Sequence, residues 1–123
     1  MAAPNLIGAN TILGKTTGAN LTSTSTTTVL NNGASSNKTL KVNVINYTNY
    51  SSGAVLATVS YFNAANVGGT EFKIVDLATV PAYSTLNVID KTSQYYLEEN
   101  TSFGAKSNVA NSVIVTVSYE EIS

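Results

Sequence analysis

A chain of 123 residues is long enough to bury the core of one domain and too short for two domains of ordinary size. Only 11% of the residues are charged and the formal net charge is −1, so the composition offers no basic surface to attract nucleic acid or an anionic membrane. His and Cys are both absent, which removes the commonest general base, thiolate metal sites and disulfides. We therefore expect a protein without catalytic residues, cofactor or metal, and without nucleic-acid or membrane partners.

The beginning of the chain shows no export signal. Residues 1–10 lack the positively charged segment and the long apolar segment of a secretory signal peptide. No apolar run approaches the roughly 18 residues that a transmembrane helix requires. We expect a protein that is made and assembled in the cytoplasm without crossing a membrane.

Uncharged polar residues dominate the chain, since Thr, Ser and Asn make up 46 of the 123 residues. Thr favours strands because its β-branched side chain stiffens an extended backbone, whereas Asn and Ser favour turns. No window places apolar residues at the i, i+3, i+4 and i+7 positions of an amphipathic helix. The composition therefore predicts a β-rich fold with many turns.

Residues 1–30 differ from the rest of the chain. The apolar pairs Leu6-Ile7 and Ile12-Leu13 are separated by Gly and polar residues, and a run of Ser and Thr follows them. This pattern fits either an N-terminal arm or edge strands, and the Ser/Thr run fits either an exposed strand or a linker. An arm would order by burying its apolar pairs on a neighbouring subunit. In the alternative, the same pairs belong to the first strand of the domain.

From residue 39 onward, strand candidates alternate with turn residues at intervals of about 8 to 12 residues, which is typical of a sandwich or barrel. Alternation of apolar and polar residues predicts strands at residues 40–44 and 55–61. The clearest strand comes last, at residues 113–120, where no Gly or Pro interrupts the alternation. We expect this last strand to be central in its sheet.

The middle of the chain contains an irregular strand. Phe72 and Ile74 share one parity and Val75 and Leu77 share the other, so we predict a bulge near Ile74 and Val75 that turns both pairs to the core. Pro81 ends this strand. Short strands follow at residues 86–89, 95–97 and 103–106.

These elements predict an all-β fold, an antiparallel β-sandwich of about seven or eight strands that is Ig-like or jelly-roll-like. Residues 1–30 form an N-terminal arm or edge strands, and residues 31–123 form the sandwich domain. The predicted core consists of apolar residues of the expected strands: Leu40, Val42, Val44, Val55, Val59, Phe72, Ile74, Leu86, Val88, Leu97, Phe103, Val113, Val115 and Val117.

The acidic residues offer little chemistry. Neighbouring strand residues point to opposite faces, so the pairs Glu98-Glu99 and Glu120-Glu121 are not arranged to share a proton or a metal ion. A turn at Glu98-Glu99 could contribute to a calcium site with one of the two aspartates, but charges in solvated turns are the commoner arrangement.

The seven tyrosines are better candidates for function, because a large ring with a polar tip suits protein interfaces and sugar-binding surfaces. Tyr50 lies at a turn, and the adjacent Tyr95 and Tyr96 direct one ring to each face of a strand. A sandwich with so few charges has weakly protected sheet edges, so we expect a homo-oligomer. The predicted contact residues are Leu6, Ile7, Ile12, Leu13, Tyr50, Tyr95 and Tyr96.

Several short segments carry a resemblance to a known group of proteins. They are VPA at 80–82, YLEEN at 96–100, SFGA at 102–105 and VTVSYEEI at 115–122, together with the opening MAAPNLIG. With these segments, the chain from residue 39 to residue 122 resembles small β-sandwich virion proteins of tailed bacteriophages, marine phages in particular. That group usually has Gly where this chain has Asn100, a residue that also tolerates a left-handed turn.

The resemblance implies a non-enzymatic structural protein located in the virion. The first expectation is a capsid decoration or cement protein that binds the shell of major capsid proteins and stabilises it. Its partners would be the major capsid protein or another virion protein. A neck, tail or fibre-attachment component is an alternative. The Tyr and Asn content leaves a carbohydrate-binding or adhesin module as another.

Overall fold

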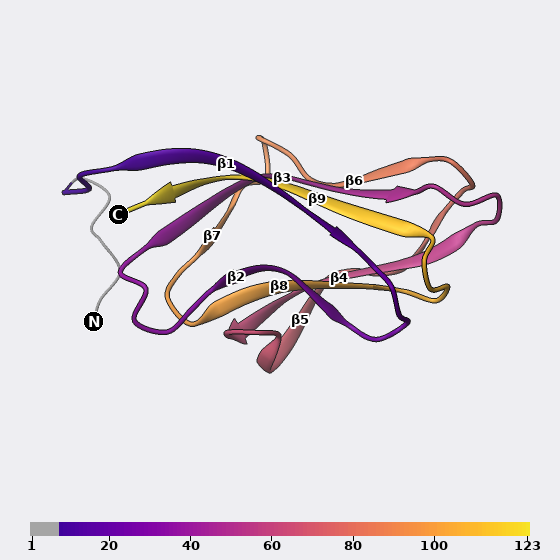
Figure 1. Cartoon of the computed structure of the whole chain (residues 1–123), viewed down its shortest axis with the longest axis horizontal. Helices are drawn as coiled ribbons and strands as arrows, with labels where there is room; N and C mark the ends of the chain where they lie inside the picture. Colours follow the sequence, from indigo (N-terminus) through magenta and orange to yellow (C-terminus); the bar gives the residue numbers. More distant parts are fainter. Residues whose placement is uncertain (1–7) are drawn as a thin grey trace.

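Two antiparallel β-sheets pack face to face (Figure 1). The structure is a computed structural model of the chain, and it describes residues 8–123. Leu6 and Ile7, two of the predicted contact residues, lie outside the described part. Within residues 8–123 every strand pair is antiparallel and no helix is formed. The predicted all-β antiparallel sandwich is confirmed.

The described residues form nine strands, against the seven or eight expected, because two strands form before residue 39, where the sequence left open an arm or edge strands. The bounds are β1 (Ile12–Asn20), β2 (Thr27–Asn32), β3 (Thr39–Asn49), β4 (Val55–Ala64), β5 (Gly68–Val80), β6 (Thr85–Ile89), β7 (Tyr95–Leu97), β8 (Thr101–Ser107) and β9 (Val113–Ile122).

The strand order is that of a jelly roll. One sheet, called sheet A, has the order β1-β9-β3-β6 with β7 also paired to β3, and sheet B has the order β2-β8-β4-β5. Partners are therefore nested: β4 pairs with β5, β3 with β6 and β7, β2 with β8, and β1 with β9. This is one long hairpin with its tip between β4 and β5, rolled into two sheets, as in double-sheet jelly rolls. The sequence left open an Ig-like or a jelly-roll-like sandwich, and the strand order is that of the jelly roll.

The last strand is central in sheet A, as its alternation predicts. β9 lies between β1 and β3, and its register with β1 runs without a shift from Ile12↔Ile122 to Asn20↔Ile114. Val113, Val115 and Val117 of β9 are fully buried, whereas Ile114 between them is exposed on the outer face.

The core lies between the two sheets and contains nine of the predicted residues. These are Leu40, Val42, Val55, Val59, Leu97, Phe103, Val113, Val115 and Val117. The sequence did not predict several others that fill the space between them: Leu21, Val29, Leu30, Ile45, Tyr47, Ala57, Val80, Ile89 and Ala105. Tyr47 is the largest of these, and its hydroxyl donates to the carbonyl of Lys106 in the opposite sheet at 2.9 Å. Burial raises the pKa of Tyr47.

Five predicted core residues are not fully buried. Val44 is half-buried because the register of β3 against β9 shifts between Val42 and Val44, which turns Ile45 to the core in its place. Phe72 is 51% exposed, which corrects its assignment to the core, because it lies on the outermost strand of sheet B. The other three are half-buried and pack against the core from the irregular strand or the edge of sheet A: Ile74, Leu86 and Val88.

The predicted bulge in β5 is confirmed in position but not in effect. The register of β4 with β5 passes from Val59↔Val75 to Ser60↔Lys73, which leaves Ile74 as the extra residue. A second irregularity follows at Leu77, which has a left-handed φ of 53° and is 57% exposed. The expectation that Phe72 and Leu77 both reach the core is therefore wrong, because the register of β5 shifts at more than the one predicted place.

The first strands are built into the sandwich. β1 and β2 are edge strands of sheets A and B, and Leu21 between them is fully buried. The division at residue 30 that the sequence analysis expected falls inside β2. The Ser/Thr run is divided too, since residues 22–26 form the loop between the two strands and β2 begins at Thr27.

Two buried asparagines join the sheets at opposite ends of the sandwich. The amide nitrogen of Asn32 on β2 donates to the carbonyl of Leu97 on β7 at 2.9 Å. The amide nitrogen of Asn49 on β3 donates to the carbonyl of Val80 on β5 at 3.1 Å, and also to Gly53. Because buried amides without partners are costly, these bonds hold the two ends of the jelly roll in one arrangement.

A small second core lies on the outer face of sheet B, above Gly104. Phe62 is only 6% exposed although it alternates with the inward residues of β4. A Cβ atom added at Gly104 would lie 2.6 Å from Val67, 2.9 Å from Thr26 and 3.0 Å from Phe62. The chain therefore needs a residue without a side chain at position 104, so that the β4–β5 turn and the β1–β2 loop can close over it.

We predict that Gly104→Ala lowers the free energy of unfolding by about 1 to 3 kcal/mol, because three anchored side chains must move apart to admit one methyl group. Chemical denaturation measures the change. Gly33→Ala is the matched control, since no atom lies within 4 Å of a Cβ built there, and it should change stability little. Equal stability of the two variants would show that the outer face over Gly104 is not packed as described.

Candidate interaction surface

The described members of the predicted contact set do not form one patch. Ile12 and Leu13 begin β1 and are 62% and 46% exposed, whereas Tyr95 and Tyr96 lie on β7. β9 and β3 stand between β1 and β7 in sheet A, so the two pairs occupy opposite edges of the sheet. Any contact surface is therefore made at one edge or the other.

Tyr50 lies at the other end of the sandwich and has a local partner. Its hydroxyl donates to the side-chain oxygen of Asn20 at the end of β1, at 3.3 Å, and its backbone N–H donates to Ser112 at 2.9 Å. The ring is 40% exposed. Tyr50 thus closes the end of sheet A where β1 and β9 are joined to β3, away from both tyrosines of β7.

A row of four aromatic rings runs across the sandwich at the β7 side. We call Phe72, Tyr61, Phe103 and Tyr95 the aromatic row. The centroid of Tyr61 lies 6.0 Å from that of Phe72 and 6.0 Å from that of Phe103, and Phe103 lies 5.8 Å from Tyr95. The last two contacts are edge-to-face, the arrangement that the ring quadrupoles favour. The row therefore links sheet B to sheet A through the buried Phe103.

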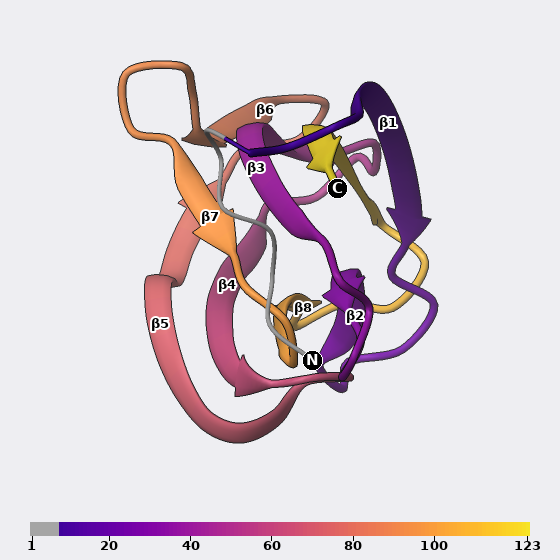
Figure 2. The ribbon, with the colours of Figure 1, turned by 90° about the vertical axis from the view of Figure 1, so that its left-hand side faces the viewer.

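The two ends of the aromatic row are open to solvent. Phe72 is 51% exposed and Tyr95 is 37% exposed, although both point to the inner side of their sheets, as their partners Tyr61 and Val42 do. Figure 2 shows the reason: β5 and β7 run along the same side of the sandwich, one from each sheet, and β7 has only three residues. The short strand leaves the side of the core uncovered.

Tyr96 extends this surface around the edge of sheet A. It alternates with Tyr95, so its ring lies on the outer face of the sheet, where it is 48% exposed. The sequence predicted Tyr95 and Tyr96 as contact residues, but it did not identify Phe103 as the ring that connects Tyr95 to Tyr61 and Phe72. Exposed aromatic residues gathered at one edge are typical of a protein interface.

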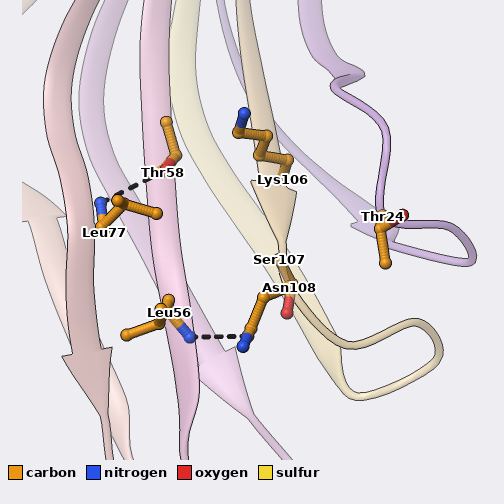
Figure 3. Close-up of a pocket in the computed structure, with 7 residues that line it drawn as sticks. All are labelled: Thr24, Leu56, Thr58, Leu77, Lys106, Ser107 and Asn108. Carbon is orange, nitrogen blue, oxygen red and sulfur yellow. Dashed lines mark hydrogen bonds between the residues drawn. The ribbon is translucent and has the colours of Figure 1, made fainter.

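A shallow groove lies on the outer face of sheet B (Figure 3). It has a volume of about 180 Å³, and its walls include the apolar side chains of Leu56 and Leu77. The hydroxyl of Thr58 accepts from the N–H of Leu77 at 3.3 Å, and the side-chain oxygen of Asn108 accepts from the N–H of Leu56 at 2.8 Å. The lining residues are Thr24, Leu56, Thr58, Leu77, Lys106, Ser107 and Asn108.

A group of charged residues lies at the end of sheet A that carries the C-terminus. Glu121 forms ion pairs with Lys38 at 3.0 Å and with Lys15 at 3.1 Å, and 14% of its side chain is exposed. Hydrogen bonds from Lys38 and Lys15 lower the pKa of Glu121. The carboxylate thereby joins β9 to β1 and to the segment that leads into β3. Its role in the structure is to hold three parts of the chain together.

Residues 8–123 form no group of acidic side chains that could hold a metal ion. The calcium site that the sequence left open needs an aspartate beside Glu98 and Glu99. No such group of three acidic side chains is present among the described residues. Within the same residues there is no helix that could span a membrane.

A comparison with models of known protein families finds no match, and no curated protein matches the chain.

We predict that Glu121→Gln lowers the free energy of unfolding by about 1 kcal/mol at pH 7, because two ammonium groups lose their counter-charge. The folded-state pKa of Glu121 is lowered, so its contribution is complete above the unfolded-state pKa and is lost as the pH falls through the folded-state pKa. The difference between variant and wild type should therefore vanish in acid.

Denaturation at pH 7 and at about pH 3 tests this prediction. Glu120→Gln is the control, since Glu120 lies 3.9 Å from Lys41 in an exposed pair and should contribute little. A loss of stability at Glu121→Gln that is the same at both pH values would contradict the electrostatic role.

Proposed function

We propose that this chain is a non-enzymatic structural protein of a virion, and specifically a capsid decoration protein that binds the shell of major capsid proteins and stabilises it. The observation that carries the proposal is the exposure of three aromatic side chains, Phe72, Tyr95 and Tyr96, on the side of the sandwich where β5 and β7 run. The resemblance of the chain to small virion proteins of tailed phages supports the assignment of the partner. The jelly-roll order adds support, because viral capsid domains commonly use this architecture.

The energetics of the aromatic surface suit a permanent contact. A fully buried aromatic side chain contributes about 1.5 to 3 kcal/mol, and Phe72 and Tyr95 together still expose a large part of their rings. Both rings are already held by neighbours in the aromatic row, so little side-chain entropy is lost on binding. A protein that binds only the assembled shell stabilises the shell by mass action.

Two alternatives differ in partner. The resemblance and the exposed aromatic residues also fit a neck, tail or fibre-attachment component, but such a component is present in few copies. A carbohydrate-binding module would use exposed tyrosines to stack on sugar rings, and jelly rolls also include lectin domains. Tyr95 and Tyr96 lie on opposite faces of β7, however, so they do not form the flat platform that stacking on a sugar chain requires.

Copy number in purified virions separates the virion positions. A decoration protein is present in on the order of hundreds of copies because it follows the symmetry of the shell, whereas a neck or tail component is present in about a dozen or fewer. Quantitative gel staining against the major capsid protein measures the ratio. Absence of the protein from purified particles would refute the virion assignment altogether.

We predict that the double variant Phe72→Ser/Tyr95→Ser binds particles assembled without the protein at least about tenfold more weakly than wild type, because both exposed rings of the proposed contact are removed. Co-sedimentation with such particles measures the affinity. Tyr83→Ser is the matched control, since Tyr83 is 73% exposed on the β5–β6 turn, outside the aromatic row. Wild-type binding by a folded double variant would show that the shell contact lies elsewhere.

A further inference from the structure

The sandwich has four sheet edges, and three of them are protected against pairing. β2 has six residues and a register shift, and the edge made by β6 and β7 is broken into strands of five and three residues. β5 is long, but it has three register shifts against β4, a left-handed residue at Leu77 and three charged residues. Short strands, bulges and charges are the usual means by which sheet edges avoid other strands.

The fourth edge, β1, is neither short nor bulged. It has nine residues in continuous register with β9, contains no Pro, and carries one charge, Lys15, which is bound to Glu121. In the described part of the chain β1 pairs with β9 alone. A regular edge strand of this length is a template for a further strand.

The backbone groups that face away from β9 can be identified. Thr11 and Ser123 exchange both N–H···O bonds, at 2.9 Å each, and the N–H of Leu21 donates to Val113 at 2.9 Å, so odd-numbered residues of β1 bond to β9. In an antiparallel pair the intervening residues direct both backbone groups outward. The free groups of the edge therefore belong to Ile12, Gly14, Thr16, Gly18 and Asn20.

We propose that β1 pairs with β1 of a second copy of this chain, antiparallel across a two-fold axis at Thr16. In this register Thr16 lies opposite Thr16 of the second copy, Gly14 opposite Gly18, and Ile12 opposite Asn20. All five outward-facing residues are then paired, with about ten main-chain hydrogen bonds. The two copies of sheet A become one continuous sheet. The inference goes beyond the proposed virion role and does not depend on it.

Charge and length select this register among the symmetric ones. Centring the pair on Lys15 would set two ammonium groups directly opposite each other, whereas centring on Thr16 sets Lys15 opposite Thr17. Centring on Gly14 or Gly18 would leave part of each strand unpaired. The side chains that meet on the outer face are small and uncharged around the axis, so they allow the backbones to approach.

The oligomeric state of the full chain tests the pairing. Wild type should sediment as a species of twice the 12.8 kDa chain mass at micromolar concentration. Thr16→Pro removes the central outward N–H without removing a bond to β9, and Thr16→Lys places two ammonium groups beside the axis. Each should raise the dimer dissociation constant at least about tenfold, with little change in the stability of the monomer measured by dilution below that constant. Thr116→Lys, on the outer face of β9, is the control and should remain dimeric.

A cysteine at the axis tests the register. The chain has no Cys, so Thr16→Cys introduces a single thiol, which a short bifunctional maleimide should join to its symmetry mate, whereas Thr116→Cys should stay uncrosslinked. A wild-type monomer over the whole concentration range would overturn the proposal, as would a dimer that Thr16→Pro leaves intact. A monomer whose Thr16→Pro variant loses binding to the shell would assign the edge to another protein instead and overturn pairing between copies.

Discussion

The pairing of β9 on both of its sides is the constraint on which the sandwich depends. β9 joins β1, the first strand, to β3, and it contributes three fully buried valines to the core. Because β9 is also the last strand of the chain, sheet A is complete only when the two ends of the sequence meet. Contacts of such high sequence separation make folding slow relative to local structures. The ion pairs of Glu121 with Lys15 and Lys38 reinforce this junction.

The same pairing explains both surfaces that the molecule leaves open. β9 holds β1 in a register without shifts, and a regular strand paired on one side presents unpaired backbone groups on the other. On the opposite side of sheet A, the position next to β3 is divided between β6 and β7 by the turn at residues 90–94. The short β7 cannot cover β5 in the other sheet, so the aromatic row remains open at Phe72 and Tyr95.

The sequence predicted the elements well where the alternation was strict. Apolar and polar residues alternate in β9 and β3, and this alternation identified both strands. In β3, however, the register shift between Val42 and Val44 places Ile45 in the core instead of Val44. Alternation alone could not show that Phe72 would be exposed, because its parity is inward and its exposure depends on which strand lies opposite. The burial of Leu21, within a Thr-rich loop, likewise depends on the meeting of β1 and β9.

The contact residues were predicted less completely, for a related physical reason. Tyr95 and Tyr96 were predicted as contact residues because adjacent residues of a strand direct one ring to each face, which is a local property. Phe72 and Tyr61 join Tyr95 only through Phe103, and these contacts connect strands that are far apart in the chain. The weak protection of the edges could be inferred from the scarcity of charge, but the identity of the open edge required the strand order.

The outer edge of β1 is the proposed pairing site between copies of this chain. Residue-resolved amide hydrogen exchange over a range of protein concentrations tests this pairing most directly. Along β1, N–H groups that point outward alternate with N–H groups that are bound to β9. We expect the amides of Gly14, Thr16 and Gly18 to become protected as the concentration rises, while those of Lys15 and Thr17 are protected throughout. Rapid exchange at Gly14, Thr16 and Gly18 at every concentration would contradict it.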